Sequence, residues 1–276
     1  MFKFIQVQRF AKRLFDDDDT SRKASRIMLG ILAAKSPRIS QIANAISGNP
    51  EANYKMIQRF LKDADLKTAL QRFFDVQADF VIGDPTEIER AHARKTDYVG
   101  QLTEGQTRGF WLLTLATPMS GRALPCNFLT YSSATLGRES TSRNLEHQRA
   151  VAQIRTTIGS RPVVFDREFS YLTFFEYLAA SGMKFVIRLN QGSKPPKFYY
   201  DPDKREELTL LVAPDSDPKV YRDIYYKGEI KVNVIGIWKS GMSKPLWIIT
   251  NMDPEIALEM YLKRMKIEMK FRDLKS

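Results

Sequence analysis

The sequence predicts an α/β protein in which helices flank a mixed β-sheet. Three features predict it: a helical, basic segment at the start, a series of apolar strands from about residue 76, and an amphipathic helix at the end. The chain has 276 residues, of which 43% are hydrophobic and 27% charged. This size and composition are typical of a globular protein with two or three structural units.

The composition restricts the chemistry. The single cysteine, Cys126, excludes an internal disulfide and a cysteine zinc site, and the two histidines, His92 and His147, are too few for a histidine cluster. We therefore expect carboxylates to hold any metal ion, which favours Mg²⁺ or Mn²⁺. The net charge of +11 suits a polyanionic partner. No apolar run approaches the roughly 20 residues of a membrane span, and the N-terminus does not resemble a signal peptide, so we expect no membrane partner and an intracellular protein.

Residues 1–75 predict a helical DNA-binding domain. The first 70 residues contain 13 Lys or Arg against 7 Asp or Glu. A short helix breaks at Ser47-Gly48, and a second helix follows, with Lys55 and Arg59 expected outside and Tyr54, Ile57, Phe60 and Leu61 inside. This order is typical of a helix-turn-helix DNA reader, although an ordinary helical hairpin has the same outline.

Residues 76–190 predict the sheet. The expected order of elements is that of a ribonuclease-H-like core: three apolar strands, a helix, a strand, a second helix and a further strand. Residues 191–251 then carry four more candidate strands, which we interpret as an all-β insertion, and the core resumes over residues 252–276. The expected strands of the core are "FVIGD" ending at Asp84, Gly109–Thr117, Ala123–Tyr131, "PVVFD" ending at Asp166, and "KFVIRLN".

Asp84 and Asp166 are each expected to end an apolar strand. Side chains at strand ends of an open α/β sheet face the crevice where ligands bind, and in the expected core these two strands are neighbours. The pair is therefore a candidate metal site. The alternative is that both aspartates are turn or N-cap residues, which would explain Asp166 before a helix.

A row of polar residues lies on the last helix. At about 100° per residue, Tyr261, Arg264, Glu268 and Lys275 fall within an arc of roughly 60°, between two apolar stripes and away from the charged face. A polar row on a buried or cleft-facing surface must be paired, hydrogen-bonded or metal-ligating, which favours a functional role. The alternative is a surface ion pair between Arg264 and Glu268.

These residues carry a resemblance to a known family. Tyr261-x2-Arg264-x3-Glu268-x6-Lys275 resembles the Y-x2-R-x3-E-x6-K signature of DDE transposases of insertion-sequence family four. The stretches "DPTEIERAHARKTDYVG" and "FDREFSY" resemble the surroundings of the first two catalytic aspartates of that family. The resemblance covers the chain from about residue 76 to its end, and residues 1–75 look like the part that binds the ends of the element.

The resemblance implies an enzyme that cleaves and joins DNA strands at the ends of an insertion sequence. It implies that Asp84, Asp166 and Glu268 are catalytic ligands of two Mg²⁺ or Mn²⁺ ions, and that Tyr261, Arg264 and Lys275 bind DNA. It also implies that Trp238 in the β-rich segment stacks on a flipped base, whereas packing on its own strands is the alternative for Trp238 and Trp247. The implied partners are double-stranded DNA and a second copy of the full-length chain, in the cytoplasm of a prokaryote and associated with its nucleoid.

Eight residues follow Glu268, fewer than the helical sequence that follows the third acid in this family. We therefore expect a C-terminally truncated chain. Two alternatives to the transposase follow: a truncated relative that binds element ends without cutting them, and a ribonuclease-H-like nuclease unrelated to mobility.

Overall fold

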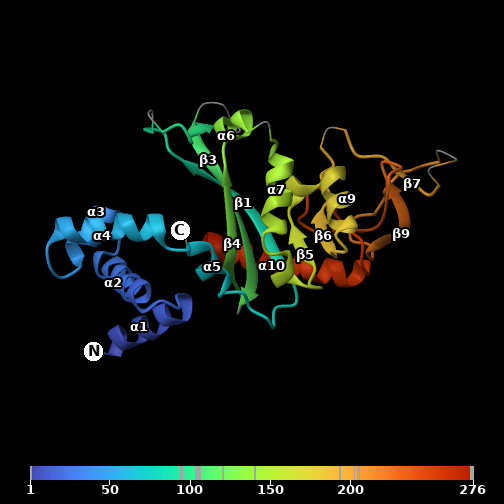
Figure 1. Cartoon of the computed structure of the whole chain (residues 1–276). Helices are drawn as coiled ribbons and strands as arrows, with labels where there is room; N and C mark the ends of the chain where they lie inside the picture. The colour runs from blue at the N-terminus through green and yellow to red at the C-terminus, as the bar shows by residue number, and fades with distance from the viewer. Residues whose placement is uncertain are drawn as a thin grey trace. The chain divides into compact units, whose positions relative to one another are not determined.

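The computed structural model describes residues 2–93, 96–102, 107–119, 121–139, 141–192, 194–201, 203 and 206–273, with the side chains of residues 2–4 and 266–273 left out. The chain divides into two compact units, Met1–Phe73 and Phe74–Ser276 (Figure 1). Among the described residues, no helix is long and apolar enough to cross a membrane.

Unit 1 is entirely helical in its described part. Asp17 caps the second helix by accepting from the Thr20 amide, and Asn49 caps the fourth, which has Pro50 as its first residue. The helices bury a small apolar core that includes Ile57 and Phe60. The helices are α1 (Phe2–Leu14), α2 (Asp18–Ala34), α3 (Ile39–Ala45), α4 (Pro50–Asp63) and α5 (Leu66–Gln71).

The turn between α3 and α4 is closed by a buried side chain. The side-chain amide nitrogen Nδ2 of Asn53 donates to the backbone carbonyls of Ala43 (3.2 Å) and Ile46 (3.0 Å), so α4 is fixed against the end of α3. Lys55 and Arg59 are exposed, as the sequence predicted. The prediction for Leu61 was wrong: its side chain is 47% exposed, because the side of α4 that packs on the core is the one that carries Ile57 and Phe60.

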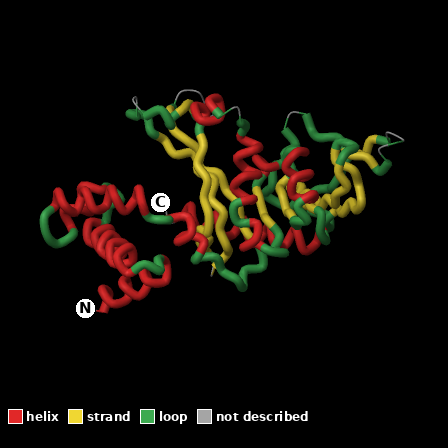
Figure 2. Tube along the Cα trace, in the orientation of Figure 1, coloured by secondary structure: helices red, strands yellow, loops and turns green. Residues whose placement is uncertain are grey.

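Unit 2 is a mixed α/β structure built on one sheet (Figure 2). Strands β1, β5 and β6 are parallel neighbours, and the other pairings are antiparallel. The described strands run in the order β2-β3-β1-β5-β6-β11-β10-β9-β7-β8, with β4 on β3. The strands are β1 (Val81–Glu89), β2 (Gly100–Gln101), β3 (Arg108–Met119), β4 (Arg122–Tyr131), β5 (Val163–Phe165), β6 (Phe185–Arg188), β7 (Phe198–Tyr199), β8 (Glu207–Leu208), β9 (Lys219–Tyr226), β10 (Ile230–Ile237) and β11 (Leu246–Thr250).

Helices cover both faces of this sheet (Figure 1). Successive strand residues point to opposite faces, so Val163 and Phe165 join the core under α7 and α9, while Val164 joins the core under α10. Gly182, with φ of 66°, follows the end of α9, in the left-handed conformation that glycine adopts without strain. The helices are α6 (Ser133–Arg138), α7 (Arg143–Ala152), α8 (Arg155–Ile158), the 3₁₀ turn η1 (Arg167–Phe169), α9 (Leu172–Ala180) and α10 (Pro254–Asp273).

The strands of residues 191–251 continue the same sheet. β11 pairs antiparallel with β6, and β10 and β9 follow beyond it. Gly236 on β10 faces Trp247 on β11, where an added Cβ would come within 2.2 Å of the indole ring. The β-rich segment therefore extends the sheet that carries Asp84 and Asp166.

β1 runs past Asp84. The prediction that this strand ends at Asp84 was wrong, because antiparallel pairing with β3 continues from Ile82 to Glu89. The parallel pairing with β5 covers Val81–Gly83. Asp84 thus lies just beyond the last β1 residue that pairs with β5, while the pairing of β1 with β3 continues.

Candidate functional site

Asp84, Asp166 and Arg188 form a row across three parallel strands. Ile82 on β1, Val164 on β5 and Val186 on β6 are in register, and all three side chains belong to the core under α10. The next residues on that face lie two positions further along each chain, because side chains alternate with a period of two. These are Asp84, Asp166 and Arg188, so the sheet directs two carboxylates and a guanidinium toward the α10 side.

Helix α10 contacts both carboxylates. Nη2 of Arg264 lies 3.1 Å from Oδ1 of Asp84, and the hydroxyl of Tyr261 donates to Oδ1 of Asp166 at 3.1 Å. The guanidinium of Arg264 also lies 5.7 Å from the centre of the Tyr261 ring. Both α10 side chains are 1% exposed. The prediction that this row faces a buried surface is therefore confirmed for Tyr261 and Arg264.

Burial and charge keep Tyr261 in its neutral form. Burial is the main cause that raises the pKa of its phenol, and the neighbouring Asp166 carboxylate raises that pKa further. Tyr261 is thus a hydrogen-bond donor to Asp166 rather than an anion. This bond orients one oxygen of the carboxylate.

Arg188 is a site residue that the sequence analysis missed. Its Nη1 lies 3.9 Å from Oδ1 of Asp166, and its side chain is half-buried at the end of β6. The available signal was the charged residue that ends the apolar run "FVIR". Its closeness to Asp166 depends on the parallel pairing of β5 with β6, which the strand pattern alone does not specify.

The side chains described at this site offer the kind of donor atoms, carboxylate oxygens, that bind a divalent cation. The Asp84 and Asp166 side chains are 51% and 32% exposed, and carboxylate oxygens are the ligands that Mg²⁺ and Mn²⁺ prefer. Within the described residues there is no group of three or more His, Cys, Asp or Glu that could hold a metal ion. The Glu268 side chain and the whole of Lys275 lie outside the described residues. The backbone of Glu268 continues α10 about one turn beyond Arg264.

The two tryptophans of the β-rich segment differ. Trp247 is 2% exposed and packs in the core beside Tyr221, which agrees with the packing alternative. Trp238 is half-buried just after β10, and its indole N–H donates to the Met242 carbonyl at 3.0 Å. Its proposed contact with a flipped base stays a prediction.

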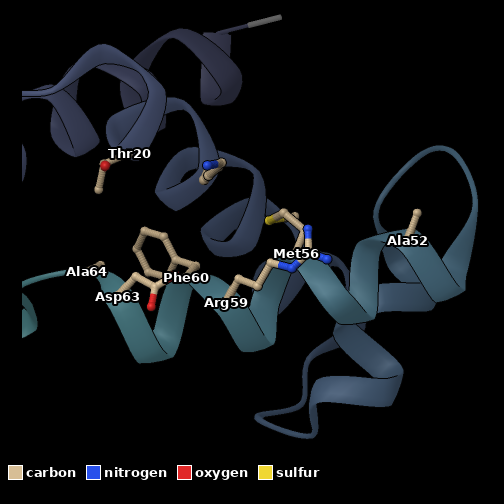
Figure 3. A pocket seen from close by; sticks show the side chains of 8 residues that line it. Thr20, Ala52, Met56, Arg59, Phe60, Asp63 and Ala64 are labelled. Atoms are coloured by element: carbon tan, nitrogen blue, oxygen red, sulfur yellow. The ribbon is translucent and has the colours of Figure 1, made fainter.

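Lys55 and Arg59 lie on the exposed side of α4 in unit 1. Nζ of Lys55 contacts Glu51 at 2.7 Å. Arg59 lines an open groove of about 200 Å³ between α2 and α4, together with Lys23 and Asp63 (Figure 3). The groove therefore carries cationic side chains from both helices.

Comparison of the sequence with protein-family models and with curated proteins finds no match.

Proposed function

We propose that this chain is a DDE transposase with a ribonuclease-H-like core, which cleaves DNA at the ends of an insertion sequence and transfers the strands. One observation carries the proposal. Tyr261 and Arg264, two members of the family signature, contact Asp166 and Asp84, the two aspartates that the family resemblance assigns to catalysis. Residues up to 180 positions apart are thus brought together by one helix.

The chain's own residues suit phosphoryl transfer on DNA. Asp84, Asp166 and Glu268 would hold two Mg²⁺ or Mn²⁺ ions, which when bound neutralise the attacking and leaving oxygens. Arg188, whose side chain is one-third exposed, can pair with phosphate oxygens through its planar fork, and the buried Arg264 adds positive charge to the same row. The neutral phenol of Tyr261 donates a hydrogen bond to Asp166. Lys275 would add a further cation that binds the DNA backbone.

Unit 1 supports recognition of double-stranded DNA. The helix pair α3–α4 has a four-residue connection, residues 46–49, closed by the buried Asn53. Lys55 and Arg59 on α4 are exposed to solvent, which phosphate binding requires. We propose that this unit binds the inverted repeats in a prokaryotic cell, and that the full-length protein self-associates to hold two ends.

A DNA duplex carrying the sequences that flank the gene, taken as the proposed element ends, tests the proposal. We expect nicking that needs Mg²⁺ or Mn²⁺ and is lost in Asp84→Asn and Asp166→Asn. Asp217→Asn, which changes an exposed aspartate in a loop, is the matched control and should retain activity. Cleavage without preference for element ends would instead favour a general nuclease.

A second candidate is a protein that binds element ends without cutting them. It is favoured by the ion pair in which the Arg264 guanidinium already holds the Asp84 carboxylate. The same experiment separates the two candidates. A mobility shift of the end duplex without metal-dependent product would support the binding protein and overturn the transposase.

A further inference from the structure

Arg143, the first residue of α7, makes three contacts with its guanidinium. Nη2 donates to Oε2 of Glu168 at 2.6 Å, and Nε donates to the Tyr131 hydroxyl at 3.3 Å. The guanidinium carbon lies 5.3 Å from the centre of the Trp111 ring. Glu168 belongs to η1, the turn that directly follows Asp166. Arg143 therefore connects α7, β3 and β4 to the turn beside a candidate metal ligand.

Helix formation does not account for an arginine at this position. The first turn of a helix has unpaired amides and a partial positive charge, so a cation there is unfavourable. Ser142 already caps α7 by accepting from the Leu145 amide. The charge of Arg143 is accounted for by its contacts with Glu168, Tyr131 and Trp111.

A buried, neutral chain of hydrogen bonds lies behind Arg143. The Tyr131 hydroxyl is 2.9 Å from Nε2 of His147, and Nδ1 of His147 is 3.1 Å from the Tyr171 hydroxyl. His147 is 1% exposed, and burial lowers its pKa to about 3, so the imidazole is neutral. A neutral imidazole has one donor and one acceptor, which matches a bridge between two hydroxyl groups. Arg143 supplies the charge at the outer end of this chain.

The turn η1 is held against α7 at two successive residues. Phe169 is buried, with its ring 4.4 Å from the His147 ring and 4.3 Å from the Phe165 ring. Its amide donates to the Asp166 carbonyl at 3.1 Å, which closes the turn. Glu168, half-exposed beside it, is held by Arg143. The backbone that carries Asp166 is thus clamped from one side by α7 and from the other by the sheet.

We infer that Arg143 is a positioning residue, which fixes η1 through Glu168 and so sets the direction in which Asp166 presents its carboxylate. A half-exposed ion pair alone contributes little, because holding two long side chains together costs entropy. Here the Tyr131 hydroxyl and the Trp111 ring already fix the guanidinium, so that cost is smaller. The Trp111 indole also donates to Glu87 at 3.1 Å, three residues beyond Asp84 on β1. The inference rests on the proposed function where it treats Asp166 as a metal ligand.

Hydrogen exchange of the unliganded chain tests the first half of the inference. The variants are Arg143→Gln, Glu168→Gln and the double variant, with Arg143→Lys as the conservative change. Lys197→Gln, which breaks a 2.7 Å ion pair with Glu207 in the β7–β8 hairpin, is the matched control. We expect amides of residues 166–171 to exchange about 10-fold faster in Arg143→Gln and Glu168→Gln, and no faster still in the double variant. Arg143→Lys should lie between them and the wild type, because lysine keeps the charge but lacks the fork.

Calorimetric titration with Mn²⁺ alone tests the second half. We expect the dissociation constant to rise about 10-fold in Arg143→Gln and Glu168→Gln and to stay unchanged in Lys197→Gln. Glu168→Gln keeps the test meaningful if Arg143→Gln fails to fold, because Glu168 is half-exposed. Unchanged exchange in the turn would overturn the inference whatever the protein does with DNA. Faster exchange without weaker Mn²⁺ binding would also overturn it, since Arg143 would then order the turn without positioning Asp166. If both expected effects occur but end duplex is not cut, the proposed function alone fails.

Discussion

The guanidinium of Arg264 lies 3.1 Å from the carboxylate of Asp84, although 180 residues separate them in the chain. The two partners differ in environment: Arg264 is 1% exposed, whereas the Asp84 side chain is about half exposed. The charge of Arg264 is therefore buried by α10 and the sheet, and the carboxylate opens to solvent. Such a pair holds the site together while leaving oxygen atoms accessible to a ligand.

The first prediction concerns the strength of this pair. We expect a double-mutant cycle with Asp84→Asn and Arg264→Met to give a coupling free energy of about 1–2 kcal/mol, since one partner is buried and the other partly solvated. Urea unfolding of the four proteins measures it. The matched cycle uses Arg222 and Glu255, a 2.7 Å pair exposed on both sides, and should give about 0.5 kcal/mol or less. Equal coupling in the two cycles would contradict the prediction.

The hydroxyl of Tyr261 gives a second prediction. Tyr261→Phe removes the bond to Asp166 and keeps the buried ring, so we expect a loss of about 1 kcal/mol in the free energy of unfolding. The value stays modest because Asp166 is one-third exposed and water can replace the donor. Tyr200→Phe, at an exposed tyrosine, is the control and should change little. If Tyr261→Phe left the free energy of unfolding unchanged, the hydroxyl would not orient the carboxylate.

Gly83 precedes Asp84, and a side chain there would collide with Phe165, which precedes Asp166. A Cβ at Gly83 would lie 1.8 Å from Cε1 of Phe165. We therefore expect Gly83→Ala to lower the free energy of unfolding by about 1–3 kcal/mol through overpacking, and Phe165→Leu to restore part of that loss in the double variant.

The control for this prediction is Gly137→Ala. Gly137 lies in α6, and an added Cβ there has nothing within 4 Å. Alanine should be neutral there or stabilise by about 0.5–1 kcal/mol. Thermal unfolding of the variants checks both expectations. If Gly83→Ala were as stable as Gly137→Ala, the close packing of β1 on β5 would not hold.

Much of the site followed from periodicity in the sequence. Tyr261 and Arg264 could be predicted as buried because a helix places them between apolar stripes, and both side chains are buried in the described part of α10. The neighbouring strands of Asp84 and Asp166 followed from the order of the elements. Whether Glu268 and Lys275 complete the row stays a prediction, since neither side chain is described.

The features of the site that could not be predicted depend on which strands pair with each other in the sheet. Arg188 reaches Asp166 because β5 lies beside β6, and no local pattern specifies that neighbour. β1 continues to Glu89 because β3 supplies an antiparallel partner along that length. The sharp change from apolar to polar residues at Asp84 marks the end of burial in β1, not the end of the strand.

A fourth prediction is a pH dependence caused by His147. Burial lowers its pKa from 6.5 to about 3, so between these values the unfolded chain binds a proton that the folded chain does not. Stability due to the neutral imidazole is complete above pH 6.5 and falls as the pH drops toward 3, with a slope of at most about 1.4 kcal/mol per pH unit. We expect His147→Gln, which does not titrate, to have a shallower slope in urea unfolding at pH 7, 6, 5 and 4. His92→Gln, at an exposed position, is the matched control. Parallel slopes for wild type and His147→Gln would show that His147 is protonated without unfolding.

The last prediction concerns Arg59 and Lys55 on α4. If the cations of this helix contact phosphates, each lost contact reduces the slope of log affinity against log salt concentration by about 0.9. We expect Arg59→Ala to lower both affinity and slope for duplex DNA. The effect of Lys55→Ala should be smaller, because Lys55 is already held by Glu51 at 2.7 Å. Lys67→Ala, an exposed cation on α5, is the control and should leave the slope unchanged. Equal losses for Arg59→Ala and Lys67→Ala would indicate attraction by net charge instead of a defined contact at α4. Fluorescence anisotropy between about 50 and 200 mM salt measures all four proteins under conditions in which phosphate contacts change affinity strongly.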